Sequence, residues 1–354
     1  MRESIIPGNI NQQANLLKLA EEKALTGAYL FEGPDGVGKL ALALECAARI
    51  SRKPNRLGLL QREGSVELLH PLPTLKPSSG NVDPLSLLKD DQIESYKNLY
   101  TELSGNPLLP FEHPAKAQYR VQQIRYLKSK LSNSKIGSKS VILSQADSMN
   151  KESANAMLKM LEEPPLNTFF FILAENRKNL LPTIISRCKP IRLTNPSQDE
   201  LKDWLVSKGL LDNTQNADAL LALSQNAGDF LAMTEENLKA YDTVVNFLRA
   251  VLKKNSYQLA LTEIIEKELK SSSYDYQLLF FKYLTLFFNK AFRSQFIKEK
   301  VPRTEIEKFS INFGRGINPE VIETLENGKT MLESNVQKEM VFTSVALKIR
   351  QALL

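Results

Sequence analysis

The chain has 354 residues, of which 42% are hydrophobic and 24% charged. This composition is typical of a globular protein and excludes wholesale disorder. At roughly 150 residues per domain, the length predicts two to three domains. The net charge of +6 is compatible with nucleic-acid contact but does not require it.

Cysteine and histidine are scarce. The two cysteines, Cys46 and Cys188, exclude a disulfide framework and a four-cysteine zinc site. The two histidines, His70 and His113, exclude a histidine-rich metal centre, and a hydrolase triad would need one of them as its base. The chain starts without a signal-peptide core, and its most apolar run, Leu278–Phe288, is shorter than the about 20 residues that span a bilayer. We therefore predict a cytoplasmic protein with reduced cysteines.

The first elements follow one another closely. Apolar residues at helical spacing predict a helix over 10–25, and Ala28–Phe31 is a short strand-like run. A glycine-rich turn, Gly33–Lys39, comes next, followed by an alanine- and leucine-rich helix over Leu40–Ile50. A strand, a glycine loop and a helix together form one half of a βαβ unit.

Residues 54–114 hold eight of the 17 prolines. Such density prevents long regular elements, so we predict an insertion over about 54–118 with one short helix near Leu85–Leu103. His70 lies in this segment and His113 near its end. Two histidines without further ligands make a poor metal site, and we expect both to be structural.

Regular structure then resumes as helix, strand, helix and strand, over Val121–Leu131, Ser140–Ser144, Lys151–Glu163 and Thr168–Ala174. Short apolar strands that alternate with helices predict a parallel, doubly wound sheet. Beyond Pro190 the sequence predicts no further strand.

The remainder of the chain is predicted to be helical. Ser197 with Glu200 three residues later forms a capping box. The aromatic run over 280–288 covers more than one helical face, so this helix must be buried within its domain or between subunits. A basic excess over 290–315 could contact DNA or form a solvated face. The predicted domains are an α/β domain over 1–193, a helical lid over 194–242 and a helical bundle over 243–354.

The glycine-rich turn has the pattern of a phosphate-binding loop (P-loop). Gly33, Gly36 and Gly38 would let backbone N–H groups cradle phosphate oxygens, and Lys39 would reach the β- and γ-phosphates. The pattern requires Ser or Thr next, as a Mg²⁺ ligand, but the chain has Leu40. The sequence therefore predicts a phosphate cradle that lacks its metal ligand.

The carboxylates that a P-loop ATPase needs are also missing. They would end the strand that begins at Val141, where the chain has Ser144 and Gln145. Asp147 follows two residues later. We expect it to cap the next helix, around Ser148–Asn150.

Three segments carry a family resemblance. Ala154–Pro165 (ANAMLKMLEEPP), Leu180–Cys188 (LPTIISRC) and Ile6–Ile50 resemble the corresponding motifs of bacterial DNA polymerase III clamp-loader subunits, in the same order. The pattern is most similar to the delta-prime class of this AAA+ family. The resemblance implies a RecA-like α/β domain, a small helical lid and a C-terminal helical collar. It implies gamma/tau and delta subunits, the sliding clamp and primer–template DNA as partners in a hetero-oligomer.

The resemblance also locates other parts of an ATPase site. The sensor position at the end of the strand over 168–174 has Ala174 and Glu175, and the arginine position of the lid has Leu231. With Leu40 and Gln145, these residues imply a subunit that does not hydrolyse ATP, and they leave open ATP or ADP binding without hydrolysis. The zinc module usual in the family has no cysteines here, so no zinc is expected.

Ser186 and Arg187, in the serine-arginine-cysteine motif, are the predicted catalytic contribution. The resemblance implies that Arg187 is an arginine finger that reaches the γ-phosphate of ATP in a neighbouring subunit. The alternative is an intramolecular salt bridge. Cys188 and Cys46 are expected to be buried and unreactive.

Two other functions remain open from the sequence. One is a hydrolysing, gamma/tau-like clamp-loader ATPase with unusual Mg²⁺ ligation. The other is a DNA-binding regulatory ATPase unrelated to replication. The favoured prediction is a stator without ATPase activity of its own, within a nucleotidyltransferase holoenzyme.

Overall fold

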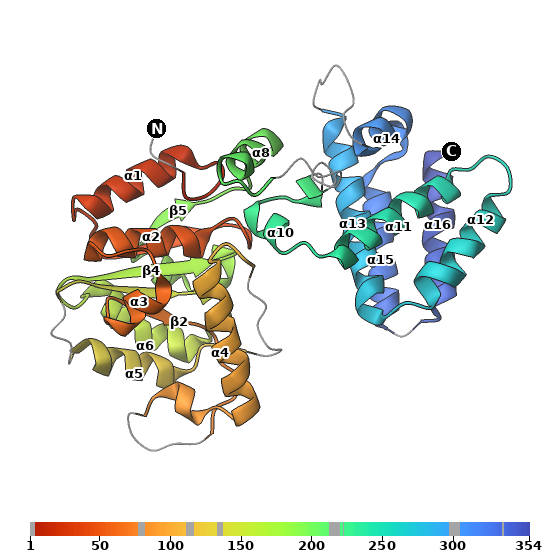
Figure 1. Cartoon of the computed structure of the whole chain (residues 1–354). Coiled ribbons are helices and arrows are strands. Elements are labelled where there is room, and N and C mark those ends of the chain that lie inside the picture. The colour runs from red at the N-terminus through yellow and green to blue at the C-terminus, as the bar shows by residue number, and fades with distance from the viewer. Residues whose placement is uncertain are drawn as a thin grey trace. The chain divides into compact units, whose positions relative to one another are not determined.

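The computed structural model describes residues 4–76, 82–110, 117–132, 137–211, 220–221, 223–296, 305–334 and 336–354. The chain forms two compact units (Figure 1). The first comprises Met1–Asn213 and Ser224–Ala232, and the second comprises Thr214–Leu223 and Met233–Leu354. The helices predicted for the lid are therefore divided between the units, and the three-domain scheme stays a prediction.

The first unit contains a five-stranded sheet in the order β2-β3-β4-β1-β5, and every pairing in it is parallel. The strands are β1 Ala28–Glu32, β2 Val66–Leu69, β3 Lys139–Leu143, β4 Thr168–Ala174 and β5 Cys188–Arg192. The predicted parallel sheet is confirmed. Of its three interior strands, β4 and β1 have the most continuous apolar sequence, as expected for strands covered on both faces.

Helices cover both faces of this sheet (Figure 1). Successive strand residues point to opposite faces, so Tyr29 and Phe31 pack in one core and Leu30 in the other. The first core includes residues of α1 Ile10–Glu21, α2 Lys39–Ser51 and α3 Leu57–Arg62. The second includes residues of α5 Val121–Ser132, α6 Lys151–Glu162 and α7 Pro182–Ile185. This is the doubly wound arrangement.

The proline-rich insertion has more structure than predicted. The expected helix is confirmed as α4 Asp90–Gly105, which a 3₁₀ turn over Pro84–Leu87 precedes. The insertion also contains α3 and β2, which the sequence prediction missed. Both are short, and the prolines lie outside them. A high proline density therefore does not exclude short helices and strands between the prolines.

The second correction concerns β5. The sequence predicted no strand beyond Pro190, but β5 continues to Arg192 and pairs Pro190 with Leu30. A proline is tolerated here because β5 is an edge strand, where one side needs no ladder hydrogen bonds. After β5, the predicted capping box is confirmed: Ser197 and Glu200 open α8 Gln198–Ser207.

The second unit is helical throughout its described residues. Its main helices are α11 Glu235–Val251, α12 Tyr257–Ile264, α13 Tyr274–Ser294, α14 Glu305–Phe313, α15 Pro319–Glu333 and α16 Lys338–Leu353. Aromatic residues of α13 form its core, with the rings of Phe280 and Phe281 at 5.8 Å. The burial predicted for this helix is confirmed and lies within its own unit. The basic segment over 290–315 lies partly outside the described residues, because 297–304 are not among them.

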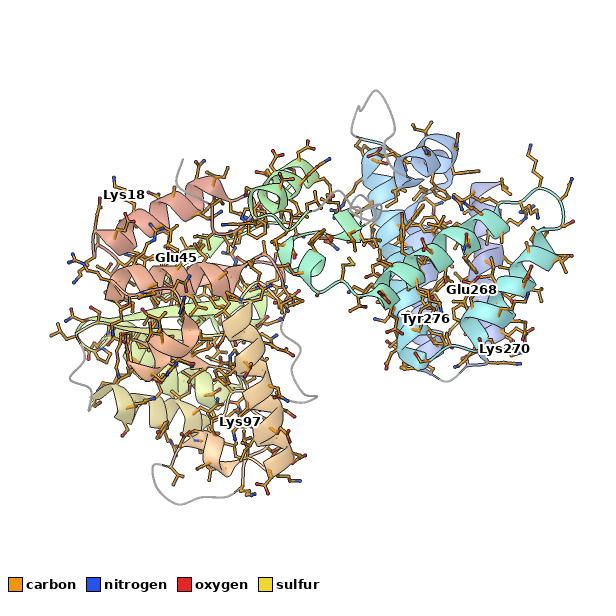
Figure 2. All side chains as sticks on the ribbon, viewed as in Figure 1. Lys18, Glu45, Lys97, Glu268, Lys270 and Tyr276 are labelled. Atoms are coloured by element: carbon orange, nitrogen blue, oxygen red, sulfur yellow. The ribbon has the colours of Figure 1, made fainter. Side chains whose placement is uncertain are left out.

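Polar side chains also join elements of this unit. Thr243 of α11 donates to Glu268 at 2.7 Å and lies 3.0 Å from the hydroxyl of Tyr276 in α13. Lys270 pairs with Glu266 and with Glu339 of α16, at 2.8 and 3.2 Å (Figure 2). Glu266, Glu268 and Lys270 belong to a π-helical turn over Ile265–Lys270. No helix among the described residues is long and apolar enough to cross a membrane.

Candidate functional site

The P-loop has the predicted setting. It leaves β1 at Glu32 and enters α2 at Lys39, and Gly36 and Gly38 have φ values of 75° and 98°. Positive φ at both positions is what glycine allows at little cost. The strand–loop–helix expectation is confirmed for the backbone.

The Lys39 side chain, however, is turned into its own loop. Its ammonium group donates to the carbonyl oxygens of Gly33 and Pro34, at 2.6 and 2.9 Å, and pairs with Asp35 at 3.2 Å. Only 9% of the residue is exposed. All three protons of the ammonium group therefore have acceptors within the loop, and none is directed to a phosphate.

A segment just before and within α10 Ala227–Leu231 covers the loop. The N–H of Gly228 donates to the carbonyl of Gly36 at 3.0 Å, and the Asn226 amide donates to the carbonyl of Asp35 at 2.9 Å. A Cβ atom added at Gly36 would overlap the Asn226 side chain and lie 3.1 Å from the Cα atom of Gly228. The absence of side chains at Gly36 and Gly228 thus allows the backbone of the P-loop and the backbone of α10 to come into contact.

Leu108, from the insertion, fills the space beside the loop. A Cβ atom at Gly38 would lie 3.2 Å from Leu108 Cδ2, and one at Gly228 would lie 2.5 Å from the Leu108 carbonyl oxygen. The cavity that remains measures about 50 Å³ and is lined by the P-loop and residues 107–110, among others. Ligand pockets usually measure about 300–1,000 Å³. The residues present therefore do not fit a nucleotide in this conformation.

Ser144, at the end of β3, takes part in a structural network. Its hydroxyl is hydrogen-bonded to Nδ1 of His70, and its carbonyl accepts from Tyr119 at 2.6 Å. His70 is 2% exposed, which agrees with the structural role predicted for it. His113 lies outside the described residues.

Asp147 does not cap a helix, so that prediction is wrong. Its carboxylate accepts from the backbone N–H groups of Glu175 and Asn176, at 3.2 and 3.4 Å, and so fixes the turn after β4. The N-cap of α6 is Asn150. Partial burial, with the nearby carboxylates of Asp35 and Asp147, raises the pKa of Glu175.

Arg187 lies between α7 and β5. Its Nη2 pairs with Glu162 at the end of α6, and its Nη1 donates to the Thr183 carbonyl at 2.9 Å. The side chain is 29% exposed, and its buried Nε–H has no hydrogen-bond partner among the described residues. The intramolecular salt bridge that the sequence left open is present, and the finger role stays a prediction. Ser186 donates to the same Thr183 carbonyl at 3.2 Å.

Both cysteines are buried, as predicted. Burial raises the pKa of the Cys188 thiol to about 12, and it raises that of Cys46 further. A thiol with a raised pKa carries almost no thiolate at neutral pH. Burial and the raised pKa both disfavour a nucleophilic thiolate at either cysteine, although Cys188 is adjacent to Arg187.

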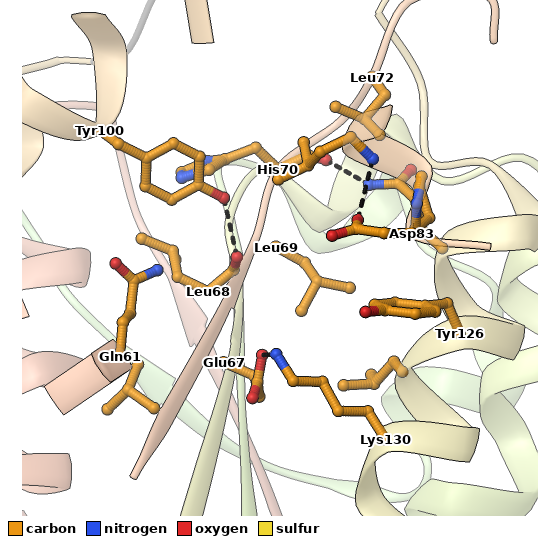
Figure 3. A pocket seen from close by; sticks show the side chains of 15 residues that line it. Gln61, Glu67, Leu68, Leu69, His70, Leu72, Asp83, Tyr100, Tyr126 and Lys130 are labelled. Atoms are coloured by element: carbon orange, nitrogen blue, oxygen red, sulfur yellow. Dashed lines mark hydrogen bonds and ion pairs between the residues drawn. The ribbon is translucent and has the colours of Figure 1, made fainter. Parts of the chain in front are cut away.

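A separate cavity of about 340 Å³ lies at the edge of β2, between α4 and α5 (Figure 3). The Tyr100 hydroxyl donates to the Leu68 carbonyl at 3.0 Å, and Lys130 pairs with Glu67 at 2.8 Å. The polar groups that face the cavity are thus largely satisfied by the chain itself. The described residues contain no group of three or more His, Cys, Asp or Glu side chains suited to a metal ion.

The structure therefore separates the predicted site residues. Gly33, Gly36, Gly38 and Lys39 form the loop, whereas Ser186 and Arg187 lie between α7 and β5. Sequence reasoning missed Leu108, Asn226 and Glu162, which contact these groups. Only Asn226 had a local signal, because its side chain caps α10. The other two contacts join segments far apart in the chain.

Comparison with known proteins agrees with the motifs. A family model described as DNA polymerase III, delta subunit, matches residues 89–197. DNA polymerase III subunit delta' of Haemophilus influenzae is 34% identical over 147 residues, which cover 41% of this chain and 44% of that protein. The Bacillus subtilis subunit is 30% identical over 233 residues, covering 63% and 61%. The Pseudomonas aeruginosa subunit is 32% identical over 216 residues, covering 60% and 57%.

The chain thus spans between about two fifths and three fifths of the length of these relatives. Among solved structures, a gamma subunit-related protein of Thermotoga maritima gives a TM-score of 0.41 at 16% identity, covering 97% of this chain and all of that one. The RuvB branch migration motor of the same organism gives 0.41 at 13% identity, covering 87% and 82%. In its matched residues, the chain is a homologue of the delta' subunits of DNA polymerase III, which confirms the resemblance predicted from its motifs.

Proposed function

We propose that the chain is a non-hydrolysing, delta'-type subunit of a cytoplasmic DNA polymerase III clamp loader. In this role it assembles with gamma/tau and delta subunits and supplies Arg187 to the ATPase site of a neighbour while the sliding clamp is loaded on primed DNA. The observation that carries the proposal is the P-loop whose lysine and ligand space are taken up by the chain itself.

The absence of hydrolysis has a chemical basis. Leu40 offers no hydroxyl for Mg²⁺, and Ser144 and Gln145 offer no carboxylate to bind the metal or to position water. The Ser144 hydroxyl is moreover hydrogen-bonded to Nδ1 of His70. A hydrolysing, gamma/tau-like ATPase would need at least one of these groups. Neither ATP nor zinc is needed for the proposed role.

The finger role rests on charge and position. A guanidinium group carries a permanent charge and a planar fork of N–H donors, which suit the charge that develops on a transferred phosphoryl group. Arg187 is partly exposed at the end of a short helix, in the motif that the delta' resemblance singles out. An arginine on the surface of one subunit can contact the nucleotide that another subunit binds.

Reconstitution of the loader with Arg187→Ala tests this proposal. We expect the ATPase rate at the adjoining site to fall at least about 1,000-fold, because arginine fingers contribute roughly 10³–10⁵ in rate. The steady-state ATPase rate of the whole loader should then fall by the fraction of the turnover that this one site contributes. The measurement is ATP turnover with clamp and primed DNA, after size-exclusion chromatography has verified assembly.

Arg177→Ala is the matched control, since Arg177 is another partly exposed arginine of the same unit, 3.7 Å from Glu32. It should leave turnover unchanged. If turnover is the same with Arg187→Ala as with the wild type, the finger assignment is wrong. Turnover by the purified chain that Lys39→Ala abolishes would instead favour the hydrolysing alternative.

A further inference from the structure

The salt bridge between Arg187 and Glu162 joins two motifs that the sequence left separate. Glu162 is the last residue of α6, in the LEEPP segment, and Arg187 follows α7. The two residues are 25 positions apart, and α6 and α7 pack against each other in the second core of the first unit. The pair is therefore held by the fold and not by local sequence.

The hydrogen bonds of the guanidinium group show what this pair does. Nη2 is bound to Glu162, and Nη1 is bound to the Thr183 carbonyl at 2.9 Å. The Nε–H is buried, so the side of the fork that includes Nε is closed to an incoming oxygen. An external phosphate could bind bidentately only through the two Nη atoms, and one of these is occupied by the Glu162 carboxylate.

The ion pair between Arg187 and Glu162 is also weak enough for Arg187 to exchange Glu162 for another anion. The side chains are 29% and 50% exposed, and an ion pair at such exposure is screened by water and salt. A phosphate oxygen carries more charge than a carboxylate oxygen and accepts stronger hydrogen bonds from arginine. A phosphate group within reach can therefore compete with Glu162 for the guanidinium group.

From this geometry we propose that Glu162 is a positioning residue, which holds Arg187 against α7 and competes with the neighbour's phosphate for it. The proposal rests on the finger role given above. In the separate subunit the guanidinium charge is compensated by Glu162. In the assembled loader, Arg187 exchanges Glu162 for the γ-phosphate, and the equilibrium between the two partners limits how often the finger is in place.

Glu162→Gln tests this competition, because it removes the charge and keeps the shape. In the reconstituted loader, kcat at the adjoining site should rise by up to about fivefold, the factor that corresponds to the upper range of an exposed ion pair. The KM for ATP should not rise, since an Arg187 freed from Glu162 binds the γ-phosphate at least as readily. In the separate chain, phenylglyoxal should modify Arg187 faster in this variant, as read by peptide mass spectrometry.

Glu163→Gln is the matched control. Glu163 is the neighbouring residue, carries the same charge and, within the described part of the chain, makes no ion pair or side-chain hydrogen bond. It should change neither kcat nor the rate of modification. Glu162→Asp, with a shorter but charged side chain, should return kcat toward the wild-type value.

The outcomes separate this inference from the proposed function. If Arg187→Ala lowers turnover but Glu162→Gln behaves as the wild type, the finger stands and the competition is refuted. A loss of turnover in Glu162→Gln would also overturn the inference, because Glu162 would then orient the engaged finger. If Arg187→Ala has no effect, both fail, although the modification rate still reports whether Glu162 covers the arginine.

Discussion

Gly36 of the P-loop combines two requirements in one residue. Its φ of 75° favours glycine, and its missing side chain lets residues 226–228 of the predicted lid approach. In a nucleotide-binding loop, glycine lets backbone N–H groups approach phosphate oxygens. Here the same property serves the contact with Asn226 and Gly228. In this chain the loop therefore contacts protein atoms and not phosphate oxygens.

A pair of substitutions distinguishes these requirements. Gly36→Ala should destabilise the first unit by about 1–2 kcal/mol for the left-handed backbone, plus about 1–3 kcal/mol for the overlap with Asn226. Gly27→Ala should show the backbone cost alone, because Gly27 has a φ of 74° and no atom within 4 Å of an added Cβ. The measurement is urea unfolding of each variant. Equal losses in the two variants would mean that the lid contact adds nothing.

The sequence predicts individual residues well where their chemistry is local. Leu40 and Gln145 show the missing ATPase groups directly, and burial of both cysteines follows from their apolar surroundings. The filling of the space beside the P-loop could not be predicted, because it depends on Leu108 and on Asn226, which lie 69 and about 190 residues from Lys39 in the chain. The partner of Arg187 depends equally on how α6 and α7 pack.

Among the elements, length and periodicity decided what could be predicted. The long elements α2, α6, α13 and β4 all have strong patterns, and the sequence located each of them. The missed strands have four and five residues, and β5 contains a proline. Both are edge strands, whose existence depends on a neighbouring strand that offers hydrogen bonds and not on their own apolar pattern.

At Gly328 in α15, the close packing of neighbouring side chains favours glycine, whereas helix propensity disfavours it. Gly328→Ala would gain about 1 kcal/mol from propensity. The new Cβ, however, would lie 2.6 Å from Val345 Cγ2 and 2.8 Å from a ring carbon of Phe281. Overpacking of this kind costs about 1–3 kcal/mol, so we expect the second unit to lose up to about 2 kcal/mol of stability.

Gly58→Ala is the comparison for this prediction. Gly58 is also helical, in α3, and an added Cβ would have no atom within 4 Å. The substitution should be neutral or stabilise by up to about 1 kcal/mol. Urea unfolding followed by circular dichroism measures both variants. A stability gain in Gly328→Ala would show that α13, α15 and α16 have room to move apart.

At the scale of the whole molecule, the P-loop and the Arg187 motif both lie in the first unit. The P-loop, the Arg187 motif and the cavity at β2 belong to the α/β sheet and its helices. The second unit consists of helices packed around aromatic side chains. The sequence predicted this contrast between α/β and all-helical parts, because short apolar strands stop near residue 190 and helical periodicity continues.

Because Leu108 and its neighbours fill the space beside the P-loop, we can predict how the protein responds to nucleotide. We call this arrangement the closed loop. Since the residues leave only about 50 Å³ beside the loop, 1 mM ATP or ADP with Mg²⁺ should not change the unfolding temperature. A ligand at 100 times its Kd would add about 2.7 kcal/mol of stability and shift the transition by several degrees. Differential scanning fluorimetry of the wild type and Lys39→Ala checks this. A saturable shift that Lys39→Ala removes would contradict the closed loop.

The contact between Leu108 and the P-loop has a consequence for regulation. The segment that fills the loop belongs to the same chain, so its local concentration is set by the covalent linkage and not by the contents of the cell. Free nucleotides, in contrast, vary with metabolism. We therefore expect this subunit to keep one conformation at the loop whatever the ratio of ATP to ADP. The proposed hetero-oligomer would then contain one subunit whose conformation does not change with the energy state of the cell.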